Sequence, residues 1–168
     1  MIPYGEISGQ HIVGAYEPKK KKKKDTYTFN INPRAVSVST DYTWYKEDDL
    51  VNISGYGFAP SVNVTINVYN ETGQSISQYP KNVSSNNTGG ITDSFVVGFK
   101  AGNYTINSTD TAYPNLNAQA AFEVVTQEIS LDKDSYNDGQ TITLTGRYWD
   151  RNSEVTIDVI NESGVSEQ

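Results

Sequence analysis

The residues with the clearest chemical potential are asparagines in Asn-x-Ser/Thr triplets, the acceptor signal for N-linked sugars. Eight such triplets, with x other than Pro, occur in 168 residues. The surrounding polar and apolar pattern places four of them on outward strand positions and four in turns. These are Asn52, Asn63, Asn103 and Asn107 on strands, and Asn70, Asn82, Asn86 and Asn161 in turns. The sequence therefore predicts N-glycosylation, with an unmodified polar strand face as the alternative.

Residues for catalysis or metal binding are scarce. The chain has one histidine, His11, and no cysteine, so a His or thiolate metal cluster and a serine or cysteine triad lack their components. We expect no enzyme activity and no cofactor other than the sugars.

One acidic stretch, "DKDSYNDG" from Asp132 to Gly139, resembles a calcium loop in the alternate spacing of its aspartates. However, Tyr136 stands where a ligand is expected, and the closing bidentate glutamate is missing. A solvated turn with positive φ at Gly139 is therefore favoured over a calcium site.

The charge balance is acidic apart from one basic run. Thirteen bases face twenty acids, and six of the bases form the run Lys19 to Lys24. The remaining surface argues against a nucleic-acid partner and for solubility. The run itself is typical of a solvated tail or of a tether to an anionic surface or an acidic neighbour. No apolar stretch is long enough for a transmembrane segment, and the first residues lack the pattern of a signal peptide.

Apolar and polar residues alternate along most of the chain, as in Val62 to Val68, and no helix of ten residues is indicated. The pattern also repeats. "VTINVYNETG" at 64–73 matches "VTIDVINESG" at 155–164 at an offset of 91, and the residues from Phe29 match those from Phe122 at an offset of 93. A period near 90 residues with many short strands predicts an all-β chain of immunoglobulin-like sandwiches.

The repeats predict one complete and two partial sandwiches. Residues 34–126 form the complete one, with a strand expected at 75–78. Tyr104 is a candidate for the tyrosine corner of such folds, with an ordinary core tyrosine as the alternative. Residues 127–168 form the first half of a second copy. Residues 1–33 form either the second half of a preceding sandwich or an N-terminal extension with the lysine run. Within them, "ISGQHIVG" from Ile7 aligns with "ITDSFVVG" from Ile91.

Two interpretations of the partial copies stay open. The chain is a segment of a longer tandem array, or the trailing half of one subunit is completed by the leading half of the next, as in strand addition. A head-to-tail contact of that kind builds a filament. The expected joint consists of Tyr27, Phe29 and Ile31 on one side and Ile142, Leu144, Val155, Ile157 and Val159 on the other.

The stretch from Leu131 to Gly164 resembles the tandem immunoglobulin-like repeats of archaeal cell-surface and S-layer proteins, especially those of ammonia-oxidising archaea. The matching positions are Asp132, Lys133, Ser135, Tyr136, Gly139, Ile142, Leu144, Gly146, Asn161 and Gly164. The first copy departs from the pattern, with Asp48 where the glycine is expected. The resemblance implies an exported, N-glycosylated structural protein at the archaeal cell surface.

We therefore expect a subunit of an extracellular filament or S-layer lattice, whose partners are copies of itself. The alternative is an adhesin or carbohydrate-binding module, in which exposed aromatic residues form the contact surface. Its candidates are Trp44, Tyr45, Tyr56, Phe58, Tyr148 and Trp149. A spacer attached to an enzyme is a third possibility.

Overall fold

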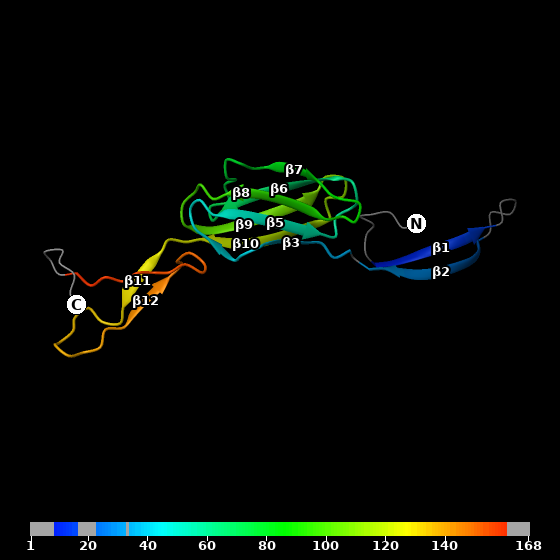
Figure 1. Cartoon of the computed structure of the whole chain (residues 1–168). Coiled ribbons are helices and arrows are strands. Elements are labelled where there is room, and N and C mark those ends of the chain that lie inside the picture. Colours follow the sequence, from blue (N-terminus) through cyan, green and yellow to red (C-terminus); the bar gives the residue numbers. More distant parts are fainter. Residues whose placement is uncertain (1–8, 17–22, 33, 161–168) are drawn as a thin grey trace. The chain divides into compact units, whose positions relative to one another are not determined.

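The computed structural model describes residues 9–16, 23–32 and 34–160. Every regular element in this part is a β-strand. The strands form a hairpin near the N-terminus, a complete sandwich, and a strand pair near the C-terminus, and each is described by itself below (Figure 1).

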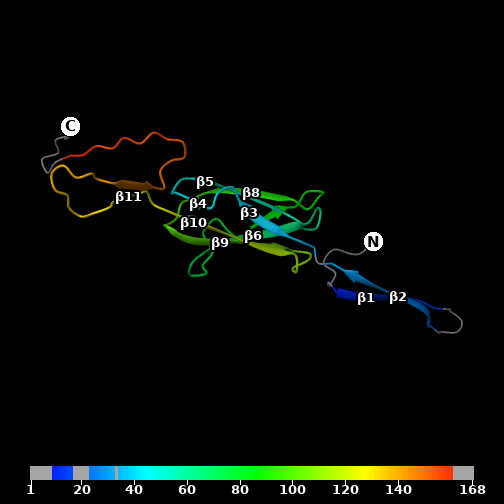
Figure 2. The ribbon, with the colours of Figure 1, turned by 90° about the horizontal axis from the view of Figure 1, so that it is seen from below.

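The sandwich consists of a three-stranded and a five-stranded sheet, seen as two layers in Figure 2. The first sheet has the order β3 (Ser37–Thr40), β5 (Leu50–Tyr56), β8 (Ile91–Val96). The second has the order β4 (Trp44–Tyr45), β10 (Asn117–Val124), β9 (Gly102–Asp110), β6 (Asn63–Asn70), β7 (Lys81–Ser84). All neighbours are antiparallel except β4 and β10. The sandwich thus begins with β3 in the three-stranded sheet, and the chain then crosses to β4 at the edge of the five-stranded sheet. This arrangement is an immunoglobulin-like sandwich.

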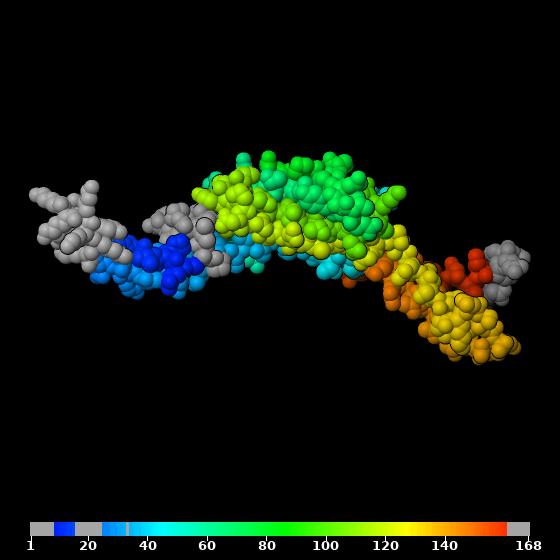
Figure 3. Space-filling view, turned by 180° about the vertical axis from the view of Figure 1, so that it is seen from behind, coloured from blue at the N-terminus to red at the C-terminus, as the bar shows by residue number. Residues whose placement is uncertain are grey.

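The core forms because alternate strand residues face the space between the sheets. In β6, Val64, Ile66 and Val68 are fully buried. Aromatic rings fill the centre: Phe122 lies edge-on to Tyr45, with 5.6 Å between centroids, and stacks on Tyr104 at 5.5 Å. The sandwich surface seen in Figure 3 is correspondingly closed, with no deep hollow on that side.

Tyr104 forms the predicted tyrosine corner. Its hydroxyl donates a hydrogen bond of 2.8 Å to the carbonyl of Lys100, four residues upstream. This contact fixes the turn that leads into β9.

The strand expected at 75–78 is wrong. Ser75 makes only an isolated bridge to Tyr69, and the chain then turns, with the Tyr79 amide donating to the Ile76 carbonyl. The edge strand forms instead at Lys81–Ser84, just after Pro80. Proline has no N–H for a ladder and is placed at the start of a strand more readily than inside one.

The N-terminal hairpin pairs β1 (Gly9–Tyr16) with β2 (Lys23–Ile31). Gly9 lies opposite Ile31, and His11 opposite Phe29. Adding 93 to each residue number gives Gly102 opposite Val124 and Tyr104 opposite Phe122, which are pairs that β9 and β10 form in the sandwich. The agreement extends to conformation: Gly9 and Gly102 have φ of 132° and 150°, and the His11 ring stacks on Phe29 at 5.7 Å.

The alignment of Ile7 with Ile91 is therefore wrong, because it would make this segment a counterpart of β8. Strand β8 pairs with β5 in the other sheet and forms no hairpin with β10. The hairpin is therefore the counterpart of β9 and β10, and the last two lysines of the run, Lys23 and Lys24, begin β2.

The C-terminal pair, β11 (Glu128–Leu131) and β12 (Leu144–Arg147), repeats the start of the sandwich. Glu128 lies opposite Arg147, as Ser37 lies opposite Tyr56 at an offset of 91. The turns agree as well. Positive φ occurs at Asp48, Gly57 and Ser61, and again 91 residues later at Gly139, Tyr148 and Asn152.

Strands form in the second copy only where both partners are present. Strand β12 matches residues 53–56 of β5, the part that pairs with β3. Residues 141–143 match residues 50–52, which pair with β8 alone, and they form no strand. Residues 153–159 also form none, and the chain there is an extended loop (orange to red in Figure 1).

Candidate assembly interface

The N-terminal hairpin exposes apolar residues whose counterparts are buried in the sandwich. Val13 is 57% exposed, whereas its counterpart Ile106 is fully buried. Tyr27 is exposed, and Phe29 and Ile31 are half-buried. The last two correspond to Phe122 and Val124 in the core.

The second copy exposes apolar residues in the same way. The five predicted joint residues here have counterparts in the sandwich that are all buried. The exposed residues are Ile142, Leu144, Val155, Ile157 and Val159, and their counterparts are Val51, Ile53, Val64, Ile66 and Val68. In three of these five pairs the residue type is identical. The second copy thus has the residues for a core and lacks the other half of that core within the described residues.

The two apolar surfaces correspond to different halves of one sandwich. The hairpin matches β9 and β10, and the second copy matches β3 to β6. Sequence reasoning missed Val13 and His11 as members of the first surface. The 93-residue offset, extended upstream from Phe29, is the signal that identifies them.

A hydrogen-bond network that closes the first turn occurs in both copies. The Tyr45 hydroxyl donates to Asp41 Oδ1 at 2.5 Å, and the Asn52 amide donates to the same oxygen at 3.1 Å. In the second copy the Tyr136 hydroxyl donates to Asp132 at 2.5 Å, and the Thr143 amide donates at 2.9 Å. The turn therefore forms from local contacts and does not require a complete sandwich.

The network shifts the acidity of its members. Burial, aided by the hydrogen bond to Asp41, raises the pKa of Tyr45 to about 12. Burial acts to raise the pKa of Asp41, but hydrogen bonds from Tyr45 and Asn52 outweigh it and lower the pKa. The hydrogen bond from Tyr136 likewise lowers the pKa of Asp132. The carboxylate that resembled a calcium ligand is thus an acceptor within its own turn.

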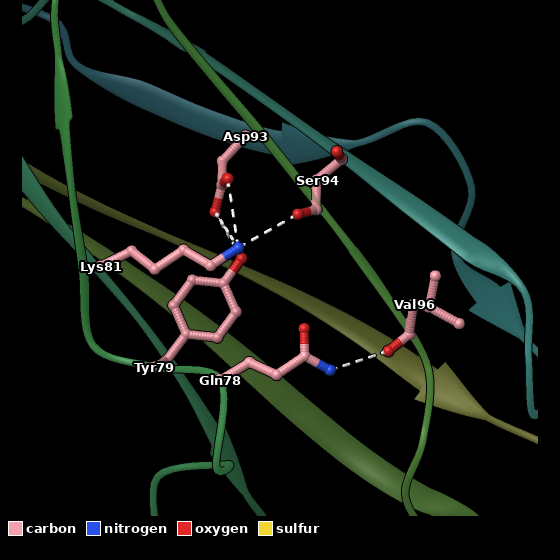
Figure 4. Close-up of polar contacts among 6 residues, drawn as sticks. All are labelled: Gln78, Tyr79, Lys81, Asp93, Ser94 and Val96. Carbon is pink, nitrogen blue, oxygen red and sulfur yellow. Dashed lines mark hydrogen bonds and ion pairs between the residues drawn. The ribbon is translucent and has the colours of Figure 1, made fainter.

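A second polar cluster joins the two sheets at the β7 edge (Figure 4). Lys81 Nζ of β7 lies 3.3 Å from Asp93 Oδ2 of β8, and the Tyr79 hydroxyl donates to the same carboxylate at 2.6 Å. Lys81 also donates to the Ser94 carbonyl and lies 4.8 Å from the centre of the Tyr79 ring. Burial and the neighbouring Asp93 raise the pKa of Tyr79. This cluster connects the sheets, and its groups are already paired with one another.

The sugar-acceptor asparagines lie at the surface to different degrees. Asn52, Asn63, Asn82, Asn86 and Asn103 are exposed, and Asn70 and Asn107 are half-buried. Asn161 lies outside the described residues. Asn70 and Asn82, both expected in turns, lie in strands instead, Asn70 as the last residue of β6 and Asn82 in β7.

Two of these asparagines differ in how the side chain is used. Asn52 Nδ2, the atom that would carry a sugar, donates to Asp41 at 2.9 Å. Asn86 instead accepts through Oδ1 from the Thr88 amide and hydroxyl of its own triplet, at 2.9 and 2.8 Å. Glycosylation at Asn52 would disturb the turn network, whereas the hydrogen bonds at Asn86 involve only the oxygen.

The aromatic residues proposed for an adhesin surface are distributed between core and surface. Tyr45 and Phe58 are fully buried, and Tyr56 is exposed. Trp149 packs on Gly146 in the second copy, where a Cβ would lie 2.7 Å from its ring nitrogen, as Phe58 packs on Gly55. At least three of the six therefore have structural roles in separate copies.

Three further features bear on function: metal-binding groups, membrane-spanning helices and similarity to known protein families. Among the described residues, no group of three His or acidic side chains is placed to hold a metal ion, and no helix is long and apolar enough to cross a membrane. No known protein family matches the chain, and no curated protein does.

Several solved structures are similar in part. Macromomycin matches over 54% of this chain and all of its own, with 13% identity and a TM-score of 0.44. The CARDB domain of a Pyrococcus furiosus protein covers 53% of this chain and 89% of its own, with 17% identity and a TM-score of 0.35. A superoxide reductase from Ignicoccus hospitalis covers 53% and 77%, with 13% identity and a TM-score of 0.35.

Proposed function

We propose that this protein is a structural subunit of an archaeal extracellular surface assembly, a filament or an S-layer lattice. Copies join because each completes a partial immunoglobulin-like sandwich of the next, and the chain has no catalytic role. The observation that supports this most is the matched pair of partial copies: the hairpin has the register of β9 and β10, and the C-terminal pair has the register of β3 and β5. The archaeal surface setting rests on the sequence resemblance and on the eight sugar-acceptor triplets.

The exposed apolar residues supply the driving force for this joint. Burying one Val, Leu or Ile side chain stabilises by about 1.5–3 kcal/mol. Association of two proteins costs about 4–15 kcal/mol in lost freedom and ordering. The five aliphatic side chains on the second copy, from Ile142 to Val159, are 37–57% exposed, so their full burial would supply about 4–7 kcal/mol in total, and the apolar side chains of the hairpin would add to this.

The geometry of such a joint determines the form of the assembly. The hairpin of one subunit and the second copy of its neighbour are different surfaces, so the contact is head-to-tail and leaves one surface unsatisfied at each end. Repetition builds a chain of subunits. Sugars on outward asparagines and the acidic surface would restrict unwanted pairing at strand edges.

Sedimentation of the 168-residue chain over a range of concentrations tests the proposal. We expect the mass to rise with concentration, and Ile157→Lys to abolish the rise, because it places a charge in the joint. Leu50→Lys is the matched control, since Leu50 is exposed to a similar degree, 52% against 57%, on the outer face of the sandwich. A chain that stays monomeric up to about 1 mM, where a joint of about 4 kcal/mol would be half-formed, would overturn the proposal.

A further inference from the structure

We infer that the β1–β2 hairpin of one subunit occupies, in the second copy of the next subunit, the place that β9 and β10 occupy in the complete sandwich. Strand β1 then pairs antiparallel with residues 156–160, and Val13 lies opposite Val159. This inference rests on the proposed function and specifies the partner strand and the register of its joint.

The register follows from the complete sandwich. Strand β9 pairs there with β6, with Ile106 opposite Val68 and Ser108 opposite Ile66. The hairpin matches β9 at an offset of 93, and the second copy matches β6 at an offset of 91. These offsets place Val13 opposite Val159 and Ala15 opposite Ile157.

The state of the second copy shows which partner it lacks. The counterparts of β6 and β4 form no strands there, although the counterparts of β3 and part of β5 do. In the complete sandwich β9 pairs with β6, and β10 pairs with β4, where Val124 lies opposite Tyr45. The empty strand positions of the second copy thus include those that pair with β9 and β10 in the sandwich, and residues 141–143, whose counterparts pair with β8, are empty as well.

Ring packing points to the same arrangement. In the sandwich, Phe122 lies edge-on to Tyr45 with 5.6 Å between centroids. The counterparts are Phe29 on the hairpin and Tyr136 in the second copy, and both are only half-buried within this chain. In the joint, Ile31 lies beside Tyr136 and Phe29 covers its ring.

Single-cysteine variants test the register, because the chain has no cysteine of its own. Val13→Cys is mixed with Val159→Cys under mild oxidation, and covalent dimers are read on a non-reducing gel and by mass spectrometry. The control mixture pairs Val13→Cys with Val155→Cys. That position lies four residues out of register, about 13 Å along the strand, beyond the Cα separation of about 7 Å that a disulfide allows.

We expect the mixed dimer from the first mixture and not from the second. If both mixtures assemble by sedimentation but the 13–159 link does not form, or forms no faster than the 13–155 link, the inferred register is wrong and the proposed function stands. If neither mixture nor the unmodified chain assembles, the proposed function itself is overturned.

Discussion

Ile66 and Ile157 hold the same place in two copies of one repeat, yet Ile66 is fully buried and Ile157 is 57% exposed. The two copies share their first strand pair, their turn hydrogen bonds and three positive-φ positions. They differ in every feature that needs a non-local partner. Local sequence therefore forms the turns and the first pairing, whereas burial and the later strands depend on the second half of the sandwich.

The largest expected difference between the copies comes from truncating these two isoleucines. Ile66→Ala should lower the free energy of unfolding of the sandwich by about 3 kcal/mol, because it leaves a cavity in a closed core. Ile157→Ala should leave that value unchanged in dilute solution. Urea titration of both variants at low protein concentration checks this. An equal loss in both would mean that Ile157 is already part of a formed core.

The cluster of Tyr79, Lys81 and Asp93 joins the two sheets of the complete sandwich. Tyr79→Phe should lower the free energy of unfolding by about 1.5 kcal/mol, since it removes a buried hydroxyl that donates to a carboxylate. Tyr27→Phe is the control, because Tyr27 is 72% exposed. Thermal unfolding of the two variants measures the difference, and an unchanged midpoint for Tyr79→Phe would show that the cluster does not stabilise the contact between sheets.

Tyr104 and His11 occupy the same position in their hairpins. Tyr104→Phe should cost about 1 kcal/mol of sandwich stability through loss of the hydrogen bond to the Lys100 carbonyl. His11→Phe should not change the unfolding of the sandwich. Urea titration of each variant gives its free energy of unfolding. A lower free energy of unfolding of the sandwich in His11→Phe would contradict the assignment of this hairpin to a different sandwich.

Replacing Asp41 and replacing Asp132 should give the smallest difference in sandwich stability, and this difference should be present at pH 7 and disappear at low pH. A carboxyl whose pKa is lower in the folded protein stabilises the fold above its unfolded pKa, about 3.9, and that stability is lost as the pH falls through the folded pKa. The pKa of Asp41 is lowered, so Asp41→Asn should reduce the stability of the sandwich at pH 7 and flatten its decline below pH 4. The effect should stay below about 1 kcal/mol because the carboxylate is exposed to solvent.

Asp132→Asn is the control and should leave the unfolding curve of the sandwich unchanged at all pH values. Chemical denaturation at pH 3 and pH 7 separates the two aspartates. An equal pH dependence in wild type and Asp41→Asn would show that Asp41 does not contribute through its charge.

Much of the fold could be predicted from the sequence, because alternation and the 91-residue repeat directly reflect strands and their order. The tyrosine corner at Tyr104 followed from the position of its strand. The edge strand was misplaced, since residues 75–78 alternate like a strand but turn before Pro80. The short sequence match between Ile7 and Ile91 points to β8 as the counterpart of β1. Only the strand pairing shows that the counterpart is β9, because β1 pairs with β2 as β9 pairs with β10, whereas β8 pairs with β5.

The joint itself stays a prediction. Alternation together with the repeat indicates the apolar residues on both of its sides, whereas Val13 joins them only once β1 is matched to β9 by its pairing. Two-residue β4 could not be found from periodicity, since Trp44 and Tyr45 pair with β10, nearly eighty residues away. Such contacts are set by the closed sandwich and leave no local pattern.

Electron microscopy of the assembled protein at side-chain resolution tests whether one subunit completes the sandwich of the next. We expect the β1–β2 hairpin of one subunit to lie beside residues 156–160 of the next, with Val13 opposite Val159 and Phe29 over the ring of Tyr136. Density that continues covalently from Gln168 into the rest of the second sandwich, or an assembly held together by other surfaces with both halves unpaired, would contradict it.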